Sequence, residues 1–210
     1  MMRSVRHLSV ACAALVLGAC SSAPIHFHTL VPPVAGDTGH ATAPFRIAVA
    51  PVGIPAGVDQ PALVVRQGQG SMALLENEQW IAPLGDEIRT VVADEAGRRL
   101  GTTDVYGLAA SGDQPVYRIK IDVTRFESVP SQYVLVSAAW SIGLAGKGAD
   151  KKQALQCAST YRVPVGPGYD ALVAGHQQAL TSLADQIAAA VSAMQRTGGN
   201  TCPSPAATHP

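Results

Sequence analysis

A cysteine near the N-terminus is the residue whose chemistry the sequence defines best. Arg3 and Arg6 form a short basic start, residues 8–16 are mostly apolar, and small residues then lead to Cys20. A basic start, a short apolar run and a small-residue cleavage site are typical of a secretory signal peptide. The apolar run is shorter than the roughly 20 residues that a helix needs to cross a bilayer core of about 30 Å. The sequence therefore predicts export, with removal of the N-terminal segment.

The residues just before this cysteine also predict a lipid modification. Leu17-Gly18-Ala19-Cys20 resembles the bacterial lipobox, in which the signal peptide, here residues 1–19, is cut off and the cysteine is acylated. Several acyl chains attach a protein stably, at roughly 0.8 kcal/mol per buried methylene. Ser21 stands where Asp retains a lipoprotein in the inner membrane of enteric-type bacteria, so we expect an outer-membrane anchor with the domain facing the periplasm. The alternative is an ordinary signal peptide cut elsewhere, with Cys20 incidental.

Two cysteines beyond the anchor are candidates for a disulfide bond. Cys157 and Cys202 would lie in the periplasm, an oxidising compartment in which such bonds form and persist. The bond would join the C-terminal tail to the last strand. Two unpaired thiols remain the alternative, because sequence spacing does not define the geometry that a disulfide requires.

The histidines do not form a pattern that predicts catalysis or metal binding. His26 and His28 are two residues apart, which suits neither a helix face nor a Cys/His finger, so we expect solvated linker histidines. His176 falls on the apolar stripe of the last predicted helix, and no nucleophile can be assigned to it from spacing. No Gly-x-Ser-x-Gly motif exists either. The sequence predicts a protein that is not an enzyme and that needs no cofactor or metal.

Composition limits the possible partners of the mature chain. Without Arg3 and Arg6, 13 of the 15 Lys and Arg residues remain against 15 Asp and Glu. This slightly acidic balance lacks the clustered positive charge on which nucleic-acid binding depends. The length from Cys20 onward is enough for one domain with a buried core.

The mature chain divides into a tether, a domain and a tail. Residues 20–44 are rich in Pro, Gly, Ala, Thr and His, which predicts a lipidated flexible tether. Fully extended, these residues would reach at most about 80 Å, so the domain could stand away from the membrane. Residues 45–196 form the predicted domain, and residues 197–210 form a Pro-rich tail that we expect to be loose.

Alternating and helical patterns predict the elements of the domain. Alternation predicts strands over 45–49, 62–66, 71–76, 117–123, 134–142 and 155–163. Phe126 is out of phase with the fourth of these, which indicates a bulge near Thr124. Helical spacing predicts helices from Leu84 to Leu100 and from about Asp170 to Arg196, each followed by glycine. The fold class is α+β, a two-layer domain with a mostly antiparallel sheet packed against two amphipathic helices.

Three apolar residues are candidates for a partner interface. Trp80 precedes the first helix and is either a core residue or an interface anchor, since Trp is enriched at interface hot spots. Val64 and Val65 lie in a short strand that could be a sheet edge, and edges recruit other chains by strand addition. Self-association is therefore a further expectation.

Several stretches in a fixed order carry a resemblance to a known family. They are Cys20-Ser21-Ser22, His28-Thr29-Leu30, Ile47-Ala48-Val49-Ala50-Pro51-Val52, Val58-Asp59-Gln60-Pro61, Val64-Val65-Arg66, Trp80 to Leu84 and Gly168 to Val173. Together they resemble the ABC-type transport auxiliary lipoproteins, the PqiC-like (YmbA-like) family. Departures are His28, where the family usually has Tyr, and the C-terminal extension with Cys202.

This resemblance implies a role without a reaction. Such lipoproteins accompany MCE-domain proteins together with ABC-type or Pqi-type inner-membrane components, in systems thought to move phospholipid or other hydrophobic molecules across the periplasm. By this resemblance the chain is an outer-membrane lipoprotein subunit that docks to the complex and that could contact lipid. The alternatives are a periplasmic enzyme or ligand-binding lipoprotein of unrelated role, and a purely structural envelope protein, because a fold does not fix function.

Overall fold

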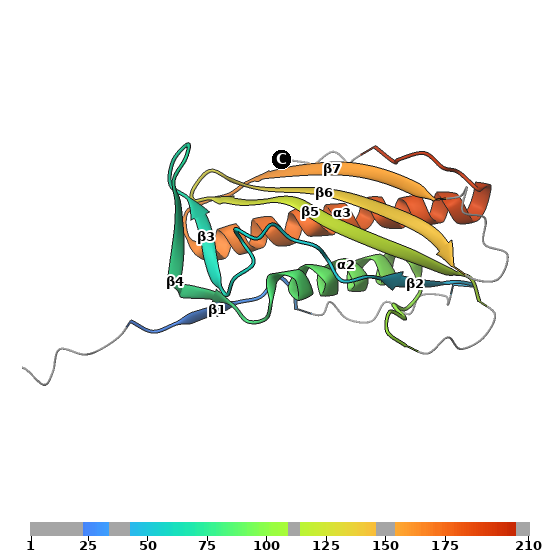
Figure 1. Ribbon diagram of the computed structural model, residues 1–210, viewed down its shortest axis with the longest axis horizontal. Helices are drawn as coiled ribbons and strands as arrows, with labels where there is room; N and C mark the ends of the chain where they lie inside the picture. The colour runs from blue at the N-terminus through green and yellow to red at the C-terminus, as the bar shows by residue number, and fades with distance from the viewer. Residues whose placement is uncertain (1–22, 34–42, 109–113, 146–153, 205–210) are drawn as a thin grey trace, which may run out of the picture.

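The computed structural model describes residues 23–33, 43–108, 114–145 and 154–204, which form two sheets and two helices (Figure 1). The strands are β1 (His26–His28), β2 (Arg46–Val49), β3 (Ala62–Arg66), β4 (Met72–Trp80), β5 (Val116–Val129), β6 (Tyr133–Ala145) and β7 (Leu155–Pro164), and the helices are α2 (Leu84–Leu100) and α3 (Tyr169–Thr197). This arrangement confirms the predicted α+β class. The predicted signal peptide and Cys20 lie outside the described residues.

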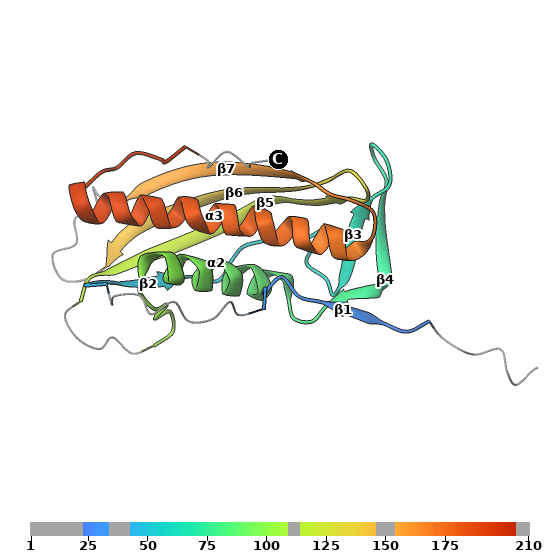
Figure 2. The same ribbon diagram turned by 180° about the vertical axis from the view of Figure 1, so that it is seen from behind.

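The larger sheet has the strand order β2-β5-β6-β7, and in the described chain the helices cover one of its faces (Figure 2). β5, β6 and β7 pair antiparallel, as predicted, whereas β2 joins the edge of β5 in parallel. Figure 2 shows α2 and α3 lying together across one face of the strands, and Figure 1 looks onto the opposite, open face. The domain therefore consists of a sheet layer and a helix layer.

Alternation along β5 separates the two faces of this sheet. Ile119 and Ile121 are fully buried against the helices, whereas Arg118 and Lys120, which alternate with them, are exposed. The register shifts between Val123 and Arg125, which confirms the predicted bulge. A bulge adds one residue to a strand. The extra residue returns the next apolar side chain, that of Phe126, to the buried face.

The two helices begin and end close to the predicted residues. Gly101 follows α2 and Gly198 follows α3, and both have positive φ angles of 62° and 65°, the left-handed conformation that glycine adopts without strain. Gly175 serves a different purpose, because a Cβ atom there would lie 2.5 Å from Val165 Cγ1 and 3.0 Å from Val134 Cγ2. This glycine lets α3 approach the sheet closely. Within the described part of the chain, neither helix is long and apolar enough to cross a bilayer.

The smaller sheet has the order β1-β4-β3 and stands at the end of the domain opposite β2 (Figure 1). β3 and β4 correspond to the strands predicted over 62–66 and 71–76 and pair antiparallel, although β4 extends four residues further than expected, to Trp80. β1 pairs with β4 in parallel, with His26 opposite Glu78 and His28 opposite Trp80. Both β1 and β3 are edge strands of this sheet.

The prediction of a tether over residues 20–44 is wrong for the segment from His26 to Leu30. β1 belongs to the smaller sheet, and the Leu30 side chain is fully buried in the core. The segment pairs with residues about 50 positions further along the chain, and a three-residue strand is too short to show alternation. Its attachment is therefore a tertiary effect that local composition does not indicate.

Candidate functional site

The three residues predicted as a partner interface lie in the core. Trp80 is 6% exposed, Val64 is 9% exposed and Val65 is 3% exposed. The prediction that Val64 and Val65 face a partner is therefore wrong, and of the two alternatives for Trp80 the core residue is confirmed, because the hairpin closes over the end of the larger sheet (Figure 1). The backbone edge of β3, by contrast, remains an edge in the described chain.

Trp80 packs in a buried aromatic cluster with Phe126 and His176. The Trp80 and Phe126 ring centroids are 6.2 Å apart in an edge-to-face arrangement, and His176 stacks on Phe126 at 3.9 Å. His176 Nε2 lies 2.8 Å from Ser128 Oγ, and burial lowers the pKa of His176 to about 3. This histidine is neutral at physiological pH. No carboxylate from the described residues contacts it, so its surroundings are those of a packed core residue and not of an acid–base catalyst.

Cys157 and Cys202 are joined by a disulfide bond, with their Cα atoms 5.8 Å apart. A buried amide strengthens the same attachment, because Gln186 on α3 donates to the carbonyl of Pro203 at 2.5 Å. The amide oxygen of Gln186 accepts from Ser159 Oγ on β7 at 2.6 Å. The expectation of a loose tail over residues 197–210 is thus wrong for its first part, which these bonds hold against β7 and α3. Residues 205–210 lie outside the described chain.

Two carboxylates hold the N-terminal segment in place. Glu87, which is 5% exposed, accepts hydrogen bonds from Thr29 Oγ1 at 2.8 Å and from the Leu30 amide at 2.7 Å. Glu78 lies between the two histidines, with its oxygens 3.0 Å from His26 Nδ1 and 2.6 Å from His28 Nε2. Burial alone would raise the pKa of Glu78, but the histidine contacts hold this pKa below its usual value of 4.5. Both histidines are therefore structural partners of Glu78, but only His28, whose side chain is 11% exposed, departs from the expectation of a solvated residue, because the His26 side chain is 61% exposed.

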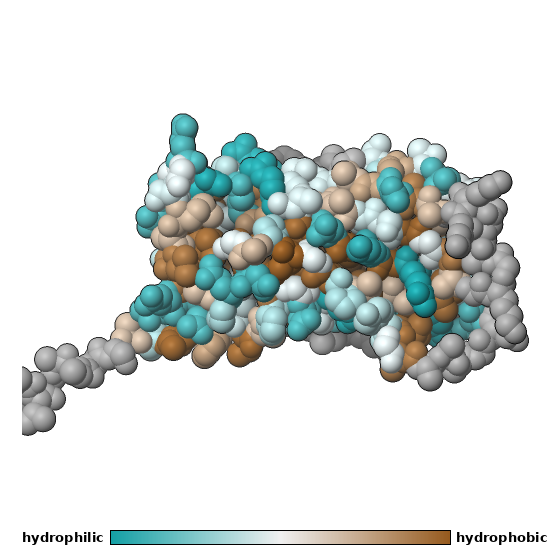
Figure 3. Space-filling view, viewed as in Figure 1, coloured by the Kyte–Doolittle hydropathy of each residue, from teal (hydrophilic) through white to brown (hydrophobic). Residues whose placement is uncertain are grey.

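Exposed apolar side chains gather around β1 and β4, and we call them the β1–β4 patch. Each is at least 41% exposed, and the set is Ile25, Phe27, Met72, Leu74 and Ile81. Figure 3 shows hydrophobic surface among hydrophilic residues at this end of the domain. The Ile81 amide donates to the His28 carbonyl at 2.9 Å, so the N-terminal segment and the end of β4 lie side by side. The patch thus depends on the docking of β1, which the sequence pattern did not predict.

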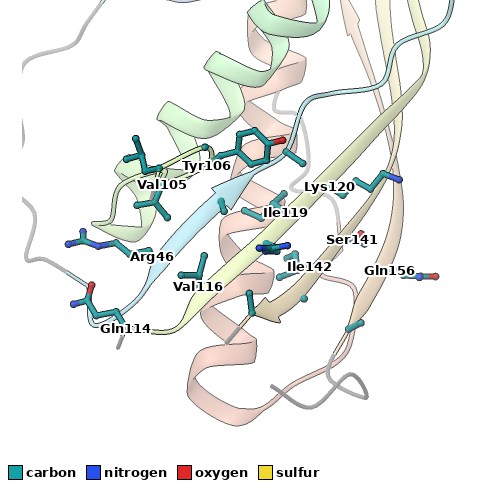
Figure 4. A pocket seen from close by; sticks show the side chains of 18 residues that line it. Arg46, Val105, Tyr106, Gln114, Val116, Ile119, Lys120, Ser141, Ile142 and Gln156 are labelled. Atoms are coloured by element: carbon teal, nitrogen blue, oxygen red, sulfur yellow. The ribbon is translucent and has the colours of Figure 1, made fainter. Parts of the chain in front are cut away.

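A second surface feature is a groove on the open face of the larger sheet, with a cavity volume of about 960 Å³. Its cationic side chains come from β2 and β5, and they are Arg46, Arg118 and Lys120. Figure 4 shows Arg46 and Lys120 on opposite sides of Val116 and Ile142. Val105, Tyr106 and Leu108 line the groove next to β2. We call this feature the open-face groove.

The described residues contain no group of three or more His, Cys, Asp or Glu side chains placed to hold a metal ion. The two surface features are instead suited to contact, one through exposed apolar side chains and the other through positive charge beside apolar surface.

Solved structures with a similar fold show how far the architecture is shared. An uncharacterized protein has a TM-score of 0.63 at 15% sequence identity, covering 80% of this chain and 99% of its own. A protein from Xanthomonas campestris has a TM-score of 0.58 at 19% identity, covering 83% of this chain and 100% of its own. At these identities the likeness concerns the fold alone.

Comparison of the sequence with family models is more informative. No curated protein matches the chain. The model of the ABC-type transport auxiliary lipoprotein component matches residues 28–188, which extend from the last residue of β1 through most of α3. The match includes Leu30 and Glu87, so the contact between these two residues lies within the family's own region. The chain belongs to the family of ABC-type transport auxiliary lipoprotein components.

Proposed function

We propose that this protein is the outer-membrane-anchored lipoprotein subunit of an MCE/ABC-type system that transports lipid or another hydrophobic solute between the two membranes. In this role it binds no cofactor and carries out no reaction. Its work is to dock to the partner complex. Family membership supports a transport-auxiliary role, and the predicted acylation of Cys20 supports the anchor.

The β1–β4 patch is the observation that carries the docking role. Monomeric proteins rarely expose large apolar side chains together, and where they do, the surface usually contacts another protein or a membrane. Phe27 is 59% exposed, Leu74 is 54% exposed and Ile81 is 60% exposed, although the core nearby is well packed. An MCE-domain partner that covers these side chains would remove them from water, at roughly 25 cal/mol for each Å² of apolar surface.

The site chemistry offers little support for the alternative of an enzyme or a small-molecule-binding lipoprotein. That alternative requires a polar pocket that brings His176 together with carboxylates. Instead, His176 is 1% exposed, stacks on Phe126 and has Ser128 as its hydrogen-bond partner. We therefore place docking ahead of catalysis.

A pull-down with matched variants tests this function. The full-length tagged lipoprotein is purified from detergent-solubilised envelopes, and we expect mass spectrometry to find an MCE-domain protein with it. Phe27→Asp together with Leu74→Asp should abolish this recovery, because two charges would be buried in the interface. Leu108→Asp is the matched control, since Leu108 is 69% exposed near the opposite end of the domain. Wild-type protein that recovers no MCE-domain protein would refute the proposal.

A further inference from the structure

The cationic side chains of the open-face groove do not stabilise the fold through ion pairs within the described chain. Within the described residues, Arg46, Arg118 and Lys120 form no ion pair, whereas Arg66, Arg89 and Arg99 all do. Among the described residues, Arg46 reaches the Thr103 hydroxyl alone, at 3.5 Å. No Asp or Glu of the described chain lines the groove, and Asp122, the next exposed residue on this face of β5, lies outside it. Three cations that line one groove attract an anion.

Strand register leaves space above these cations. Arg118 stands between Ala48 on β2 and Gly143 on β6, and neither neighbour has a side chain that could cover the guanidinium. Lys120 stands opposite Ser141 in the next row of the same face. A ligand can therefore lie across the strands and meet the charged groups from above.

The side of the groove next to β2 is apolar and fixed in position. Asp104 accepts hydrogen bonds from the Val49 amide at 3.0 Å and from the Tyr106 amide at 3.1 Å, which ties the start of this loop to β2. Gly107 has a φ angle of 77°, which allows the tight turn before Leu108. The Leu108 side chain is 69% exposed and the Tyr106 side chain is 45% exposed. A small inorganic anion would not use this apolar surface.

From this juxtaposition we infer that the open-face groove binds an anionic membrane lipid. The phosphate lies among Arg46, Arg118 and Lys120, and the first part of an acyl chain lies against Val105, Tyr106 and Leu108. The volume of about 960 Å³ is at the upper end of the roughly 300–1,000 Å³ range of small-molecule sites. The inference rests on the proposed transport function, and it adds that this subunit itself handles the lipid.

An acidic peptide is the other anion of suitable size, and the geometry favours it less. Extended peptides usually bind a sheet at its edge, where backbone groups are free to pair. The groove lies on the face of the sheet, where the backbones of β5 and β6 are already paired with their neighbours. A peptide would therefore bind through side chains alone.

Photo-crosslinking in the full-length lipoprotein tests the inference. A photoreactive phenylalanine analogue replaces Gln156, an exposed groove residue on β7, or Gln178, an exposed residue on the outer side of α3 that serves as the control. The protein is kept in non-ionic detergent and mixed with phosphatidylglycerol or with phosphatidylcholine. We expect a phosphatidylglycerol adduct at position 156 only, and a much weaker adduct with the zwitterionic lipid.

Charge removal gives the quantitative test. Arg118→Gln together with Lys120→Gln should weaken phosphatidylglycerol binding by about thirtyfold, from the usual strength of two basic residues at an anionic lipid surface. Arg162→Gln together with Arg196→Gln removes the same charge outside the groove and should leave binding unchanged. Equal labelling by both lipids, an unchanged adduct in the first variant, or displacement of the lipid by a polyglutamate peptide would each overturn the inference.

A parallel pull-down separates this inference from the proposed function. The Arg118→Gln, Lys120→Gln variant should still recover the MCE-domain protein, because the β1–β4 patch is intact in it. Partner recovery without any lipid adduct in the wild-type protein overturns the lipid site alone. If the wild-type protein gives neither a lipid adduct nor recovery of the MCE-domain protein, the transport role is overturned as well.

Discussion

The two ends of the described chain are attached to the same domain by different chemistry. The C-terminal segment is fixed covalently, by the bond between Cys157 and Cys202. The N-terminal segment is fixed by burial of Leu30 and by hydrogen bonds to Glu87 and Glu78. A disulfide is insensitive to moderate acid but depends on an oxidising compartment, whereas hydrogen bonds to carboxylates depend on pH. The difference indicates that one end is held permanently and that the other can be released.

Removing the disulfide should have the largest effect on global stability. The bond closes a loop with a sequence separation of 45, for which the chain-entropy relation gives about 4 kcal/mol. Cys157→Ala together with Cys202→Ala should lower the free energy of unfolding by up to this amount in urea titrations. Wild-type protein under reducing conditions is the control, and its free energy of unfolding should approach that of the variant. Equal stability of the oxidised wild type and the variant would contradict a structural role for the bond.

Truncating the buried N-terminal leucine should have the next largest effect. Leu30→Ala removes a fully buried side chain, and such substitutions cost about 2–5 kcal/mol. The loss should appear as faster hydrogen exchange in β1 and in the facing part of β4, with the C-terminal segment unchanged. Phe27→Ala is the control because Phe27 is 59% exposed, and it should hardly alter exchange. Uniformly faster exchange throughout the domain would show that the N-terminal segment is not released on its own.

Changing the buried carboxylate should have a smaller effect of the same kind. Glu87→Gln weakens two hydrogen bonds to a charged acceptor, each worth about 1.5–3 kcal/mol, although the amide oxygen can replace one of them. We expect faster exchange of the Leu30 amide. Glu76→Gln, at an exposed position on β4, should not change it. If both variants behave alike, Glu87 does not hold the segment.

Acid should produce the smallest and most local effect. Because the folded-state pKa of Glu78 lies below 4.5, its contribution to stability is complete above pH 4.5 and is lost as pH falls through the folded-state pKa. Backbone chemical shifts of Phe27 and His28 should therefore change with acid in the wild type. In Glu78→Gln this transition should be absent, and the disulfide segment should show none in either protein. Identical titrations of both proteins would assign the transition to another group.

Much of the fold follows from local sequence patterns. The strand Ala62–Arg66 has the predicted bounds, the bulge lies between Val123 and Arg125, and the glycines after both helices adopt the left-handed conformation. Each of these features depends on residues close together in sequence. Alternation, helical spacing and the conformational freedom of glycine are therefore sufficient to predict them.

The features that sequence reasoning missed depend on contacts between distant segments. The parallel pairing of β1 with β4 joins His26 to Glu78, and Glu87 on α2 binds Leu30. The stretch His28-Thr29-Leu30, in which the family usually has Tyr at the first position, was the available signal for this docking. The composition of the surrounding segment suggested a linker instead. The choice between core residue and interface anchor stayed open for Trp80, because the burial of a lone aromatic residue depends on which surface the hairpin covers. The open-face groove escaped notice because Arg118 and Lys120 follow ordinary alternation, and only β2 and the loop at Tyr106 make a groove of it.

The docking of β1 also determines how far the domain can travel from its anchor. If Cys20 is acylated as we propose, five residues separate it from His26, and the six Cα-to-Cα steps span at most about 20 Å. The long reach expected of a tether over residues 20–44 would then be lost. The β1–β4 patch would then stay near the bilayer surface, while the open-face groove lies beside β2, the strand at the other end of the domain in Figure 1. A partner that covers the patch must therefore extend to the membrane surface. A lipid in the groove would lie farther from the bilayer than the patch does.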